Sequence, residues 1–305
     1  MAPLLSICIP TYNRSAYLKK CIRSVISYPG NDIEIIISDN ASTDNTPEVV
    51  GDFHDKRIVY SRNPENVGPV ANFYKILKAA SGDYIFLLTD DDFLFPDSID
   101  EVIEFVKANG NIDSFKSDLI FYTEKSKSAF NYSYLKETQV LASGNVEDRA
   151  RLWQSAHVLT GCCFKREKIP AKFFEDEKFL WYPTMFLMGL LSEKQGYIAK
   201  PLAVHTWENE LFWGIKEEGK ETILMESIID TLYLMKEYGQ NEEQICACAR
   251  FLAEGVLKKN GGNPAVLPAR LTALLSDSDV RFLVKKTKAS IKKRMKLFAK
   301  KMFRL

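Results

Sequence analysis

The stretch GDYIFLLTDDDFLFPD, residues 82–97, joins an apolar run to three consecutive aspartates. Residues 83–88 have the length and apolar content of a buried strand, and Asp90, Asp91 and Asp92 follow the point where that strand ends. Uncompensated carboxylates repel one another and raise their own pKa values. A divalent cation held by carboxylates and substrate phosphates removes that penalty, which is typical of Mg²⁺ and Mn²⁺ sites. An acidic solvent loop, or a helix cap before Pro96, explains the same residues without a ligand.

Strands alternate with helices on the amino-terminal side of this stretch. Each predicted strand is short and apolar, and the segments with helical spacing are delimited by Pro or Gly. This alternation predicts an α/β fold with a mainly parallel sheet and flanking helices. The predicted strands are 4–9, 33–38, 57–60 and 83–88, and the predicted helices are 16–28, a short helix that opens at residue 46, and 68–80.

Polar residues follow these strands, at the edge where parallel α/β sheets bind ligands. Asp39 can accept hydrogen bonds from a base edge or a ribose, although SDNASTDNT (38–46) is also rich in turn formers. The guanidinium of Arg62 suits a diphosphate, although exposed loop arginines are equally common. The candidate ligand-binding residues at the strand ends are Pro10, Thr11, Tyr12, Asn13, Asp39, Asn40, Arg62, Asn66, Asp90 and Asp91.

Composition indicates a folded globular protein. The 305 residues are 46% hydrophobic and 27% charged. No run of about 18 apolar residues and no signal-peptide pattern occurs, so we expect neither a membrane span nor a secretory leader. The six cysteines are scattered without C-x-x-C pairs, which favours reduced cytoplasmic thiols over disulfides or structural zinc. A P-loop is absent, and Phe93 and Leu94 depart from the aspartyl-phosphatase motif.

Charge is distributed unevenly along the chain. Residues 281–305 contain 11 Lys or Arg and no Asp or Glu, whereas the other 280 residues hold 30 basic and 40 acidic residues. Apolar residues recur in this tail at helical spacing, which predicts an amphipathic helix on an anionic membrane surface. The alternative is that the apolar stripe packs on the body of the protein. Nucleic acid is disfavoured, because the tail lacks interleaved aromatic residues and the body is acidic. The predicted stripe is Val284, Ile291, Met295, Phe298, Met302 and Leu305.

Three ordered motifs together resemble a known enzyme family. They are SICIPTYNRSAYLKKCIRSV (6–25), IEIIISDNASTDNT (33–46) and RNPENVGPVANFYKILKAASGDYIFLLTDDD (62–92). Over about the first hundred residues the chain resembles glycosyltransferase family 2, the inverting enzymes with the Rossmann-like GT-A fold. The resemblance implies a nucleotide-sugar-binding domain and a role in assembling a bacterial surface polysaccharide such as O-antigen or capsule.

The resemblance also implies roles for individual positions. Asp92 resembles the main metal ligand of the family's acidic motif, with Asp90 and Asp91 beside it on the metal or the ribose. Thr89 stands where many members carry a first aspartate. A Mn²⁺ or Mg²⁺ ion there would bridge the diphosphate and stabilise the leaving group. The implied nucleotide contacts are Pro10, Tyr12, Asn13 and Asp39, the last on the base, which is usually uracil.

The second half of the chain contains the expected acceptor side. Residues 160–167, TGCCFKRE, look like the family's acceptor-side strand, which is usually followed by a helix with an acidic pair. The aspartate of that pair deprotonates the acceptor hydroxyl. Asp176 is the expected base, with Glu175 and Glu177 beside it as the other available acids. WYPT at 181–184 stands near where the family's acidic pair is usually found. The alternative to a catalytic role for Asp176 is that it belongs to a solvated acidic loop.

His205 follows a predicted short strand, 198–204. Its imidazole is a candidate additional ligand for the metal or the diphosphate, and the alternative is a hydrogen-bonded histidine at a strand end. Three tryptophans of this half, Trp181, Trp207 and Trp213, either stack on sugar rings or belong to the core.

We expect three regions: a GT-A catalytic domain at 1–205, a helical region at 206–280, and the basic amphipathic tail at 281–305. Helical spacing predicts helices at 218–238, 242–259 and 264–275.

The expected activity is metal-dependent transfer of a sugar from a nucleoside-diphosphate donor, with UDP-sugars favoured. The expected acceptor is a saccharide or a polyprenol-diphosphate-linked saccharide, and the expected location is cytoplasmic, peripheral on the inner face of the plasma membrane. One alternative is a non-catalytic family member that binds nucleotide-sugars or saccharides. A nucleotidyltransferase is disfavoured, because the chain lacks the Gly-rich basic loop that holds a triphosphate.

Overall fold

The chain folds into two compact units, Met1–Leu224 and Met225–Leu305. The boundary between them falls within helix α7 (Lys220–Glu237). The computed structural model describes residues 2–110, 112–123, 125–141, 145–154, 158–169, 188–189, 191–206, 220–237 and 242–302.

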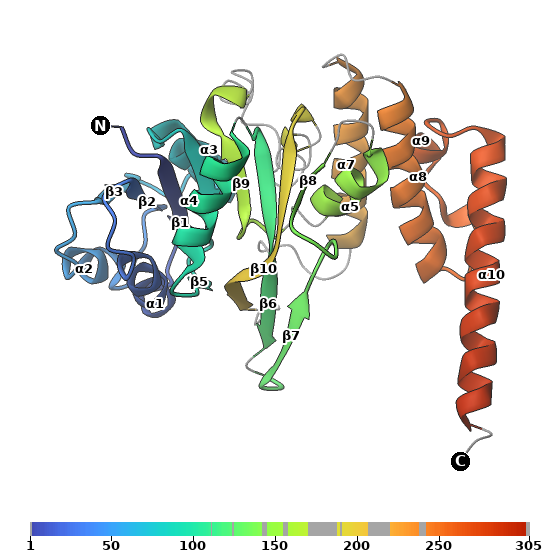
Figure 1. The fold of residues 1–305 in the computed structure, drawn as a ribbon, viewed down its shortest axis with the longest axis horizontal. Helices are drawn as coiled ribbons and strands as arrows, with labels where there is room; N and C mark the ends of the chain where they lie inside the picture. Colours follow the sequence, from blue (N-terminus) through green and yellow to red (C-terminus); the bar gives the residue numbers. More distant parts are fainter. Residues whose placement is uncertain are drawn as a thin grey trace. The chain divides into compact units, whose positions relative to one another are not determined.

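Among the described residues, ten strands form one sheet at the centre of the first unit (Figure 1). Four parallel strands make up one half of it, in the order β3-β2-β1-β4. Their isoleucine-rich and other apolar runs suit a pleated surface that is buried on both faces, which is why the sequence identifies these strands well. The parallel α/β arrangement predicted for the first hundred residues is confirmed. The four strands are β1 (Leu5–Thr11), β2 (Ile33–Asp39), β3 (Ile58–Arg62) and β4 (Tyr84–Leu87).

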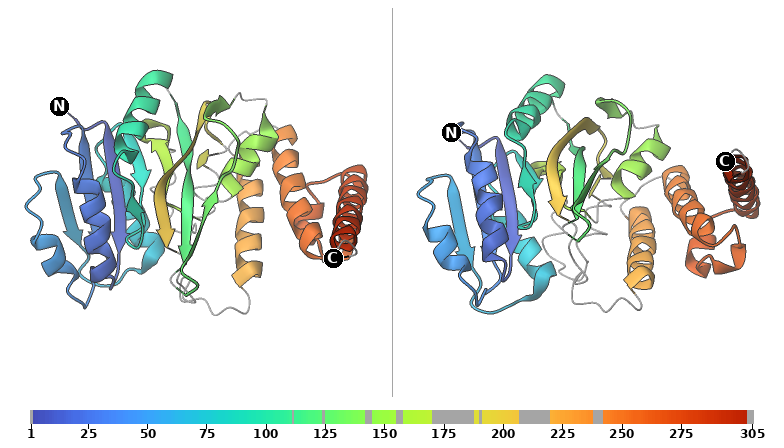
Figure 2. Two further views of the ribbon diagram at one scale, coloured as in Figure 1. Left: turned by 60° about the horizontal axis from the view of Figure 1, so that its bottom comes forward. Right: turned by 90° about the horizontal axis from the view of Figure 1, so that it is seen from below.

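Helices cover both faces of these strands, and Figure 2 shows them from two further directions. The apolar stripe of α1 joins the same buried cluster as Ile7 of β1. The next residue, Cys8, lies on the opposite face, where its thiol approaches the carbonyl of Ile76 in α3. Alternation along the strand therefore places α1 and α3 on opposite faces of the sheet. The helices of this region are α1 (Ser15–Ile26), α2 (Thr46–Gly51), α3 (Gly68–Ala79) and α4 (Ser98–Asn109).

The other half of the sheet mixes strand directions. Strand β9 runs antiparallel between β4 and β6, and β10 runs parallel to β6. Strands β5, β7 and β8 are short and antiparallel to their partners. The bounds are β5 (Phe93–Leu94), β6 (Ser114–Thr123), β7 (Ser128–Tyr132), β8 (Gln139–Leu141), β9 (Cys162–Lys165) and β10 (Gln195–Thr206), with α5 (Val146–Gln154) and the 3₁₀ turn η1 (Arg166–Lys168).

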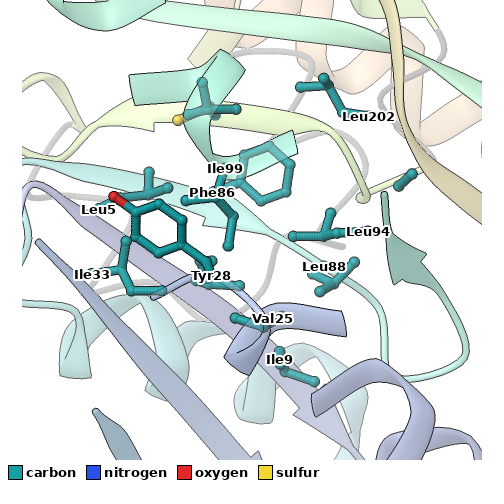
Figure 3. Close-up of a cluster of buried hydrophobic side chains, with 14 of the residues drawn as sticks. Leu5, Ile9, Val25, Tyr28, Ile33, Phe86, Leu88, Leu94, Ile99 and Leu202 are labelled. Atoms are coloured by element: carbon teal, nitrogen blue, oxygen red, sulfur yellow. The ribbon is translucent and has the colours of Figure 1, made fainter. Parts of the chain in front are cut away.

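The buried hydrophobic cluster includes residues on both sides of the acidic triplet in the sequence, and Figure 3 labels Leu88 and Leu94 among them. Leu88, just before the triplet, is fully buried, and Leu94, just after it, is 5% exposed. Both belong to the cluster that also contains Phe86, Ile99 and Leu202. Packing of both leucines in the core anchors the two ends of the short segment between them, and this restricts the positions of the aspartates.

The second unit is helical. Helices α8 and α10 pack along each other, with Lys286 3.0 Å from Glu254 and Arg250 3.2 Å from Asp279. The helix predicted at 264–275 is two short pieces, because Pro268 stands between them. The elements are α7, α8 (Glu242–Lys259), η3 (Pro264–Val266), α9 (Ala269–Thr272) and α10 (Asp277–Met302).

The predicted tail helix is the larger part of α10, and its first half packs against α8. Leu283 and Thr287 are buried, and Val284 and Ile291 of the predicted membrane stripe are half-buried. Contact of this stripe with a membrane, and its alternative of packing on the body, both stay predictions. The other stripe side chains lie outside the described ones. None of the described helices combines the length and apolarity that a membrane span requires.

Candidate active site

Three neighbouring strands end in polar residues that lie in register. Thr11 at the end of β1 pairs with Asp39 of β2, and Asp39 pairs with Arg62 of β3. The backbone extends this ladder by one residue, since the amide of Asn40 donates to the carbonyl of Thr11 at 2.9 Å. The predicted ligand-binding residues therefore do come together at the carboxyl edge of the parallel strands.

Asp39 is fully buried and organises the loop that follows it. Its Oδ1 accepts the amide of Ser42 at 2.8 Å, and its Oδ2 accepts the hydroxyl of Tyr60 at 2.7 Å. Burial and the hydrogen bond to Asp39 raise the pKa of the Tyr60 hydroxyl, so this donor stays protonated. The Nε of Arg62 lies 3.5 Å from Oδ2, with the arginine side chain 47% exposed. The carboxylate of Asp39 is thus held by donors from the loop after β2 and from β3.

Asn40 and Asn66 join the loops that follow β2 and β3. The Asn40 Nδ2 donates to Asn66 Oδ1 at 2.8 Å, and Asn40 Oδ1 accepts the amide of Val67 at 3.0 Å. Both asparagines therefore position backbone at the site edge.

The loop after β1 is shaped by Asn13, whose φ of 53° lies in the left-handed region that asparagine tolerates. Its Oδ1 accepts the amide of Thr43 at 2.6 Å, which links the loops after β1 and β2. Pro10 is half-buried, and the ring of Tyr12 is 42% exposed. The exposed ring of Tyr12 therefore offers a flat surface to a ligand group.

Arg14 is a site residue that the sequence analysis did not identify. Its Nη1 lies 3.3 Å from Asp90 Oδ1 and 2.5 Å from Asp91 Oδ2, and the hydroxyl of Thr11 donates to Asp90 Oδ2 at 2.7 Å. Burial raises the pKa values of Asp90 and Asp91, and the positive charge of Arg14 opposes that rise. A signal was present in the sequence, because a nearby cation stabilises adjacent carboxylates and Arg14 follows the first predicted strand end.

Asp92 joins three segments that are far apart in the sequence. Its side chain is fully buried, and each of its oxygens accepts hydrogen bonds. Oδ2 accepts the hydroxyls of Thr89 at 2.7 Å and Thr160 at 2.5 Å, and Oδ1 accepts the amide of Thr206 at 2.8 Å. The Nδ1 of His205 lies 2.9 Å from Oδ2. Asp92 thus holds the loop after β4, the approach to β9 and the end of β10 together.

His205 is in direct contact with the predicted metal site. Burial acts to lower the pKa of its imidazole, but the charge and the hydrogen bond of Asp92 outweigh burial and raise that pKa. The alternative role of His205, a hydrogen-bonded histidine at a strand end, matches this contact. Its role as a ligand stays a prediction.

The donor chemistry of the triplet fits Mg²⁺ or Mn²⁺. Within the described ranges no three His, Cys, Asp or Glu side chains surround a common point. Such an ion, when bound with a diphosphate, usually takes only one or two protein carboxylates. Among the three aspartates, Asp91 is the most exposed at 14%, against 7% for Asp90 and none for Asp92. The roles of Asp90, Asp92 and His205 as metal ligands are not tested by this geometry.

The predicted base lies outside the described residues. This applies to Glu175, Asp176 and Glu177, to WYPT at 181–184, and to Trp207 and Trp213. The predicted acceptor-side strand is β9, and Thr160, just before it, contacts Asp92 at the site.

A parallel α/β half-sheet with polar side chains gathered at its carboxyl edge has its candidate site where α/β proteins bind their ligands. The sequence profile of glycosyl transferase family 2 matches residues 6–168. The chain belongs to glycosyl transferase family 2, and it is a glycosyltransferase by that membership.

Known relatives and solved structures agree with this assignment. Abequosyltransferase RfbV of Salmonella typhimurium is 29% identical over 263 residues, which cover 77% of this chain and 75% of the relative. The GalNAc(5)-diNAcBac-PP-undecaprenol beta-1,3-glucosyltransferase of Campylobacter jejuni is 28% identical over 207 residues, which cover 67% of this chain and 64% of the relative. TarS 1–349 of S. aureus, solved with UDP-GlcNAc, superimposes with a TM-score of 0.64 at 15% identity, covering 93% of this chain and 88% of TarS. The GT-A fold predicted from the sequence is confirmed.

Proposed function

We propose that this chain transfers one sugar, with inversion, from a nucleoside-diphosphate donor to a saccharide or lipid-linked saccharide in surface-polysaccharide assembly. The observation that carries the proposal is the register of Thr11, Asp39 and Arg62 at the ends of three parallel strands, beside the acidic triplet. UDP-sugars are the favoured donors. The S. aureus protein that shares the fold was solved with UDP-GlcNAc, which supports this choice.

The two ends of the nucleotide have separate binding groups in this proposal. The loops after β1 and β2 take the nucleoside, with Tyr12 as a flat surface and Asp39 as the organiser of the loop. Arg62 lies about half exposed at the same edge and supplies positive charge to the diphosphate.

A Mn²⁺ or Mg²⁺ ion at the triplet would supply positive charge to the departing diphosphate. Asp92, Asp90 and His205 are the proposed candidate ligands, of which one or two carboxylates suffice when the diphosphate supplies further oxygens. Asp91 lies beside them, on the metal or the ribose. The chain's own contribution is to orient these groups. Arg14 balances the charge of Asp90 and Asp91, and the hydroxyls bonded to Asp92 fix that carboxylate.

Inversion by single displacement needs a base close to the acceptor hydroxyl. Asp176, flanked by Glu175 and Glu177, is the proposed base. The Campylobacter jejuni relative supports the acceptor class, because it is a glucosyltransferase for an undecaprenol-diphosphate-linked saccharide.

An acceptor linked to a polyprenol lies at a membrane surface, and α10 is suited to meet that surface. Its face away from α8 is cationic, and in Figure 1 its carboxyl-terminal part extends beyond α8. Each basic residue near an anionic leaflet contributes about 1 kcal/mol, so a few together hold a protein reversibly. We propose a peripheral position on the inner face of the plasma membrane. The exposed basic residues of the described part of this face are Arg281, Lys285, Lys288, Lys292 and Lys293.

Thermal unfolding with UDP, GDP, CDP or dTDP, each with Mn²⁺ or with EDTA, tests the donor site. A ligand at a hundred times its Kd adds about 2.7 kcal/mol, which corresponds to about 5–10 °C for a unit of this size. We expect one nucleotide to give this rise with Mn²⁺, and Asp91→Asn to lose it. Asp52→Asn is the matched control, because the Asp52 side chain is 68% exposed and pairs only loosely with Lys19, at 3.8 Å. No rise with any nucleotide would refute the donor proposal.

A further inference from the structure

Strand β7 carries exposed aromatic rings next to the candidate active site. All five of its residues, Ser128–Tyr132, are exposed, with Phe130 at 54% and Tyr132 at 39%. Figure 1 shows the β6–β7 hairpin extending beyond the carboxyl ends of the parallel strands. Isolated apolar residues on a surface need no explanation, but large aromatic rings gathered on one short strand mark a binding surface.

The rings of β7 are connected to the site through one buried ring. Phe130 of β7 pairs with Phe121 of β6, which pairs with His205 of β10, so the three lie in one row across the sheet. Phe121 is 5.5 Å from the ring of Phe130 and 4.9 Å from that of Tyr132. On its other side the ring of His205 lies 4.8 Å away, edge to face.

The row ends at the acidic triplet, because His205 contacts Asp92 at 2.9 Å. Side chains that alternate along a strand share a face at every second residue, so Phe130 and Tyr132 lie on the same face as His205. The two exposed rings are therefore a continuation of the site, reached from it by way of Phe121.

We propose that Phe130 and Tyr132 form an acceptor subsite that stacks one pyranose ring of the saccharide acceptor. This inference rests on the proposed glycosyl transfer. It extends that function by placing a sugar of the acceptor on the β6–β7 hairpin, beyond the reacting centre.

The chemistry of the strand fits a sugar. The sequence of β7 is SAFNY, which contains no charged residue, and the nearest described charges along the chain are Lys125 and Lys127 in the preceding turn. A pyranose has an apolar C–H face and a hydroxyl rim, so it can cover a ring while its hydroxyls stay in water. Aromatic side chains have few rotatable bonds, so they provide this contact at a low cost in conformational entropy.

A second copy of this chain is the competing occupant. Among the described strands β7 pairs with β6 alone, and an exposed edge strand can pair with another chain. Pairing of copies through β7 predicts a dimer that substitution of its rings dissociates, which light scattering after size exclusion detects.

Saturation-transfer NMR with methyl α-mannopyranoside, methyl β-galactopyranoside and methyl β-N-acetylglucosaminide, in the presence of UDP, tests the subsite. We expect saturation of the ring C–H protons of at least one probe. Phe130→Ala/Tyr132→Ala should weaken that probe's apparent Kd about ten-fold or more. Phe130→Leu keeps apolar bulk without a flat ring and should also weaken binding, whereas Tyr132→Phe keeps the ring and should not. Phe282→Ala, which removes a ring that is 62% exposed on α10, is the matched control.

Four results would overturn the subsite. They are no saturation of any probe by the wild type, equal binding by the double alanine variant, full binding by Phe130→Leu, and a wild-type dimer that the double variant dissociates. The thermal shift with UDP, measured on the same samples, separates this failure from that of the proposed function. A UDP shift without probe binding refutes the subsite alone, whereas probe binding without any nucleotide shift refutes the donor site alone.

Discussion

Replacing Asp92 by alanine removes the acceptor for four donors from three segments of the chain. These donors are the hydroxyls of Thr89 and Thr160, the amide of Thr206 and the ring of His205. The two hydroxyls lie 3.0 Å apart and can bond each other, so one of them keeps a partner.

The expected loss of stability follows from the number of hydrogen-bond donors that are left without an acceptor. One hydroxyl and the Thr206 amide each lose a hydrogen bond to a charged group, at about 1.5–3 kcal/mol per bond. We therefore expect Asp92→Ala to lower the free energy of unfolding of the first unit by about 3–6 kcal/mol. For a unit of this size that corresponds to a fall in melting temperature of about 10 °C. The pKa of His205 should also fall, because Asp92 is what raises it against burial.

Asp91→Ala is the control within the same triplet. Burial and the charge of Asp92 raise the pKa of Asp91, so its ionised form is disfavoured in the folded protein. Its removal relieves repulsion but also takes away an ion pair with Arg14, which keeps Asp90 as a partner. The two effects oppose each other, so the free energy of unfolding should change by no more than about 1 kcal/mol. Urea unfolding followed by tryptophan fluorescence gives both values, and NMR of the histidine rings gives the His205 pKa. Equal destabilisation by the two variants would refute the conclusion that Asp92 holds the three segments of the site together.

Three further predictions concern other parts of the chain. Arg57 donates to three backbone carbonyls and to Asp55. Arg57→Met should therefore lower the free energy of unfolding, measured in urea, by about 2–3 kcal/mol. Lys19→Met, which removes an exposed ion pair, should lower it by less than about 0.5 kcal/mol. The hydrogen bonds from Arg57 lower the pKa of Asp55. The stabilisation of the fold by this pair is therefore complete above the ordinary aspartate pKa of about 4 and is lost as the pH falls below it. The destabilisation by Arg57→Met should shrink over that range, and a destabilisation that does not change with pH would contradict the reasoning. Lys292→Glu/Lys293→Glu should weaken binding to anionic vesicles about thirty-fold or more in co-sedimentation, and binding that neither this change nor salt alters would refute the membrane proposal.

Sequence periodicity was sufficient to predict the strands and helices of the first hundred residues, because local signals determine the secondary structure there. Strand β2 is a run of isoleucines, and Pro47 and Pro69 stand in the first turns of α2 and α3. The strand ends then follow in register, which is why Thr11 and Asp39 were predicted to lie at one edge.

The second half of the sheet was less predictable, because its strands are defined by distant partners. Strand β5 has two residues, and it exists because it pairs with Ala203 and Val204 of β10. The partners of Asp92 could not be predicted for the same reason, because Thr160 and Thr206 are far from it in the sequence and approach it only in the folded chain. An isolated threonine carries no pattern that predicts such a contact.

Turnover of nucleotide-sugars tests the central claim most directly. The rate of nucleoside-diphosphate release from UDP-, GDP-, CDP- and dTDP-sugars should be measured with Mn²⁺ and the three methyl pyranosides as acceptors. We expect sugars of one nucleotide to be turned over, with the rate at least a hundred-fold lower in Asp91→Asn and unchanged in Asp52→Asn. Nucleotide binding without release from any donor would contradict transfer and leave a family member that binds nucleotide-sugars without catalysis.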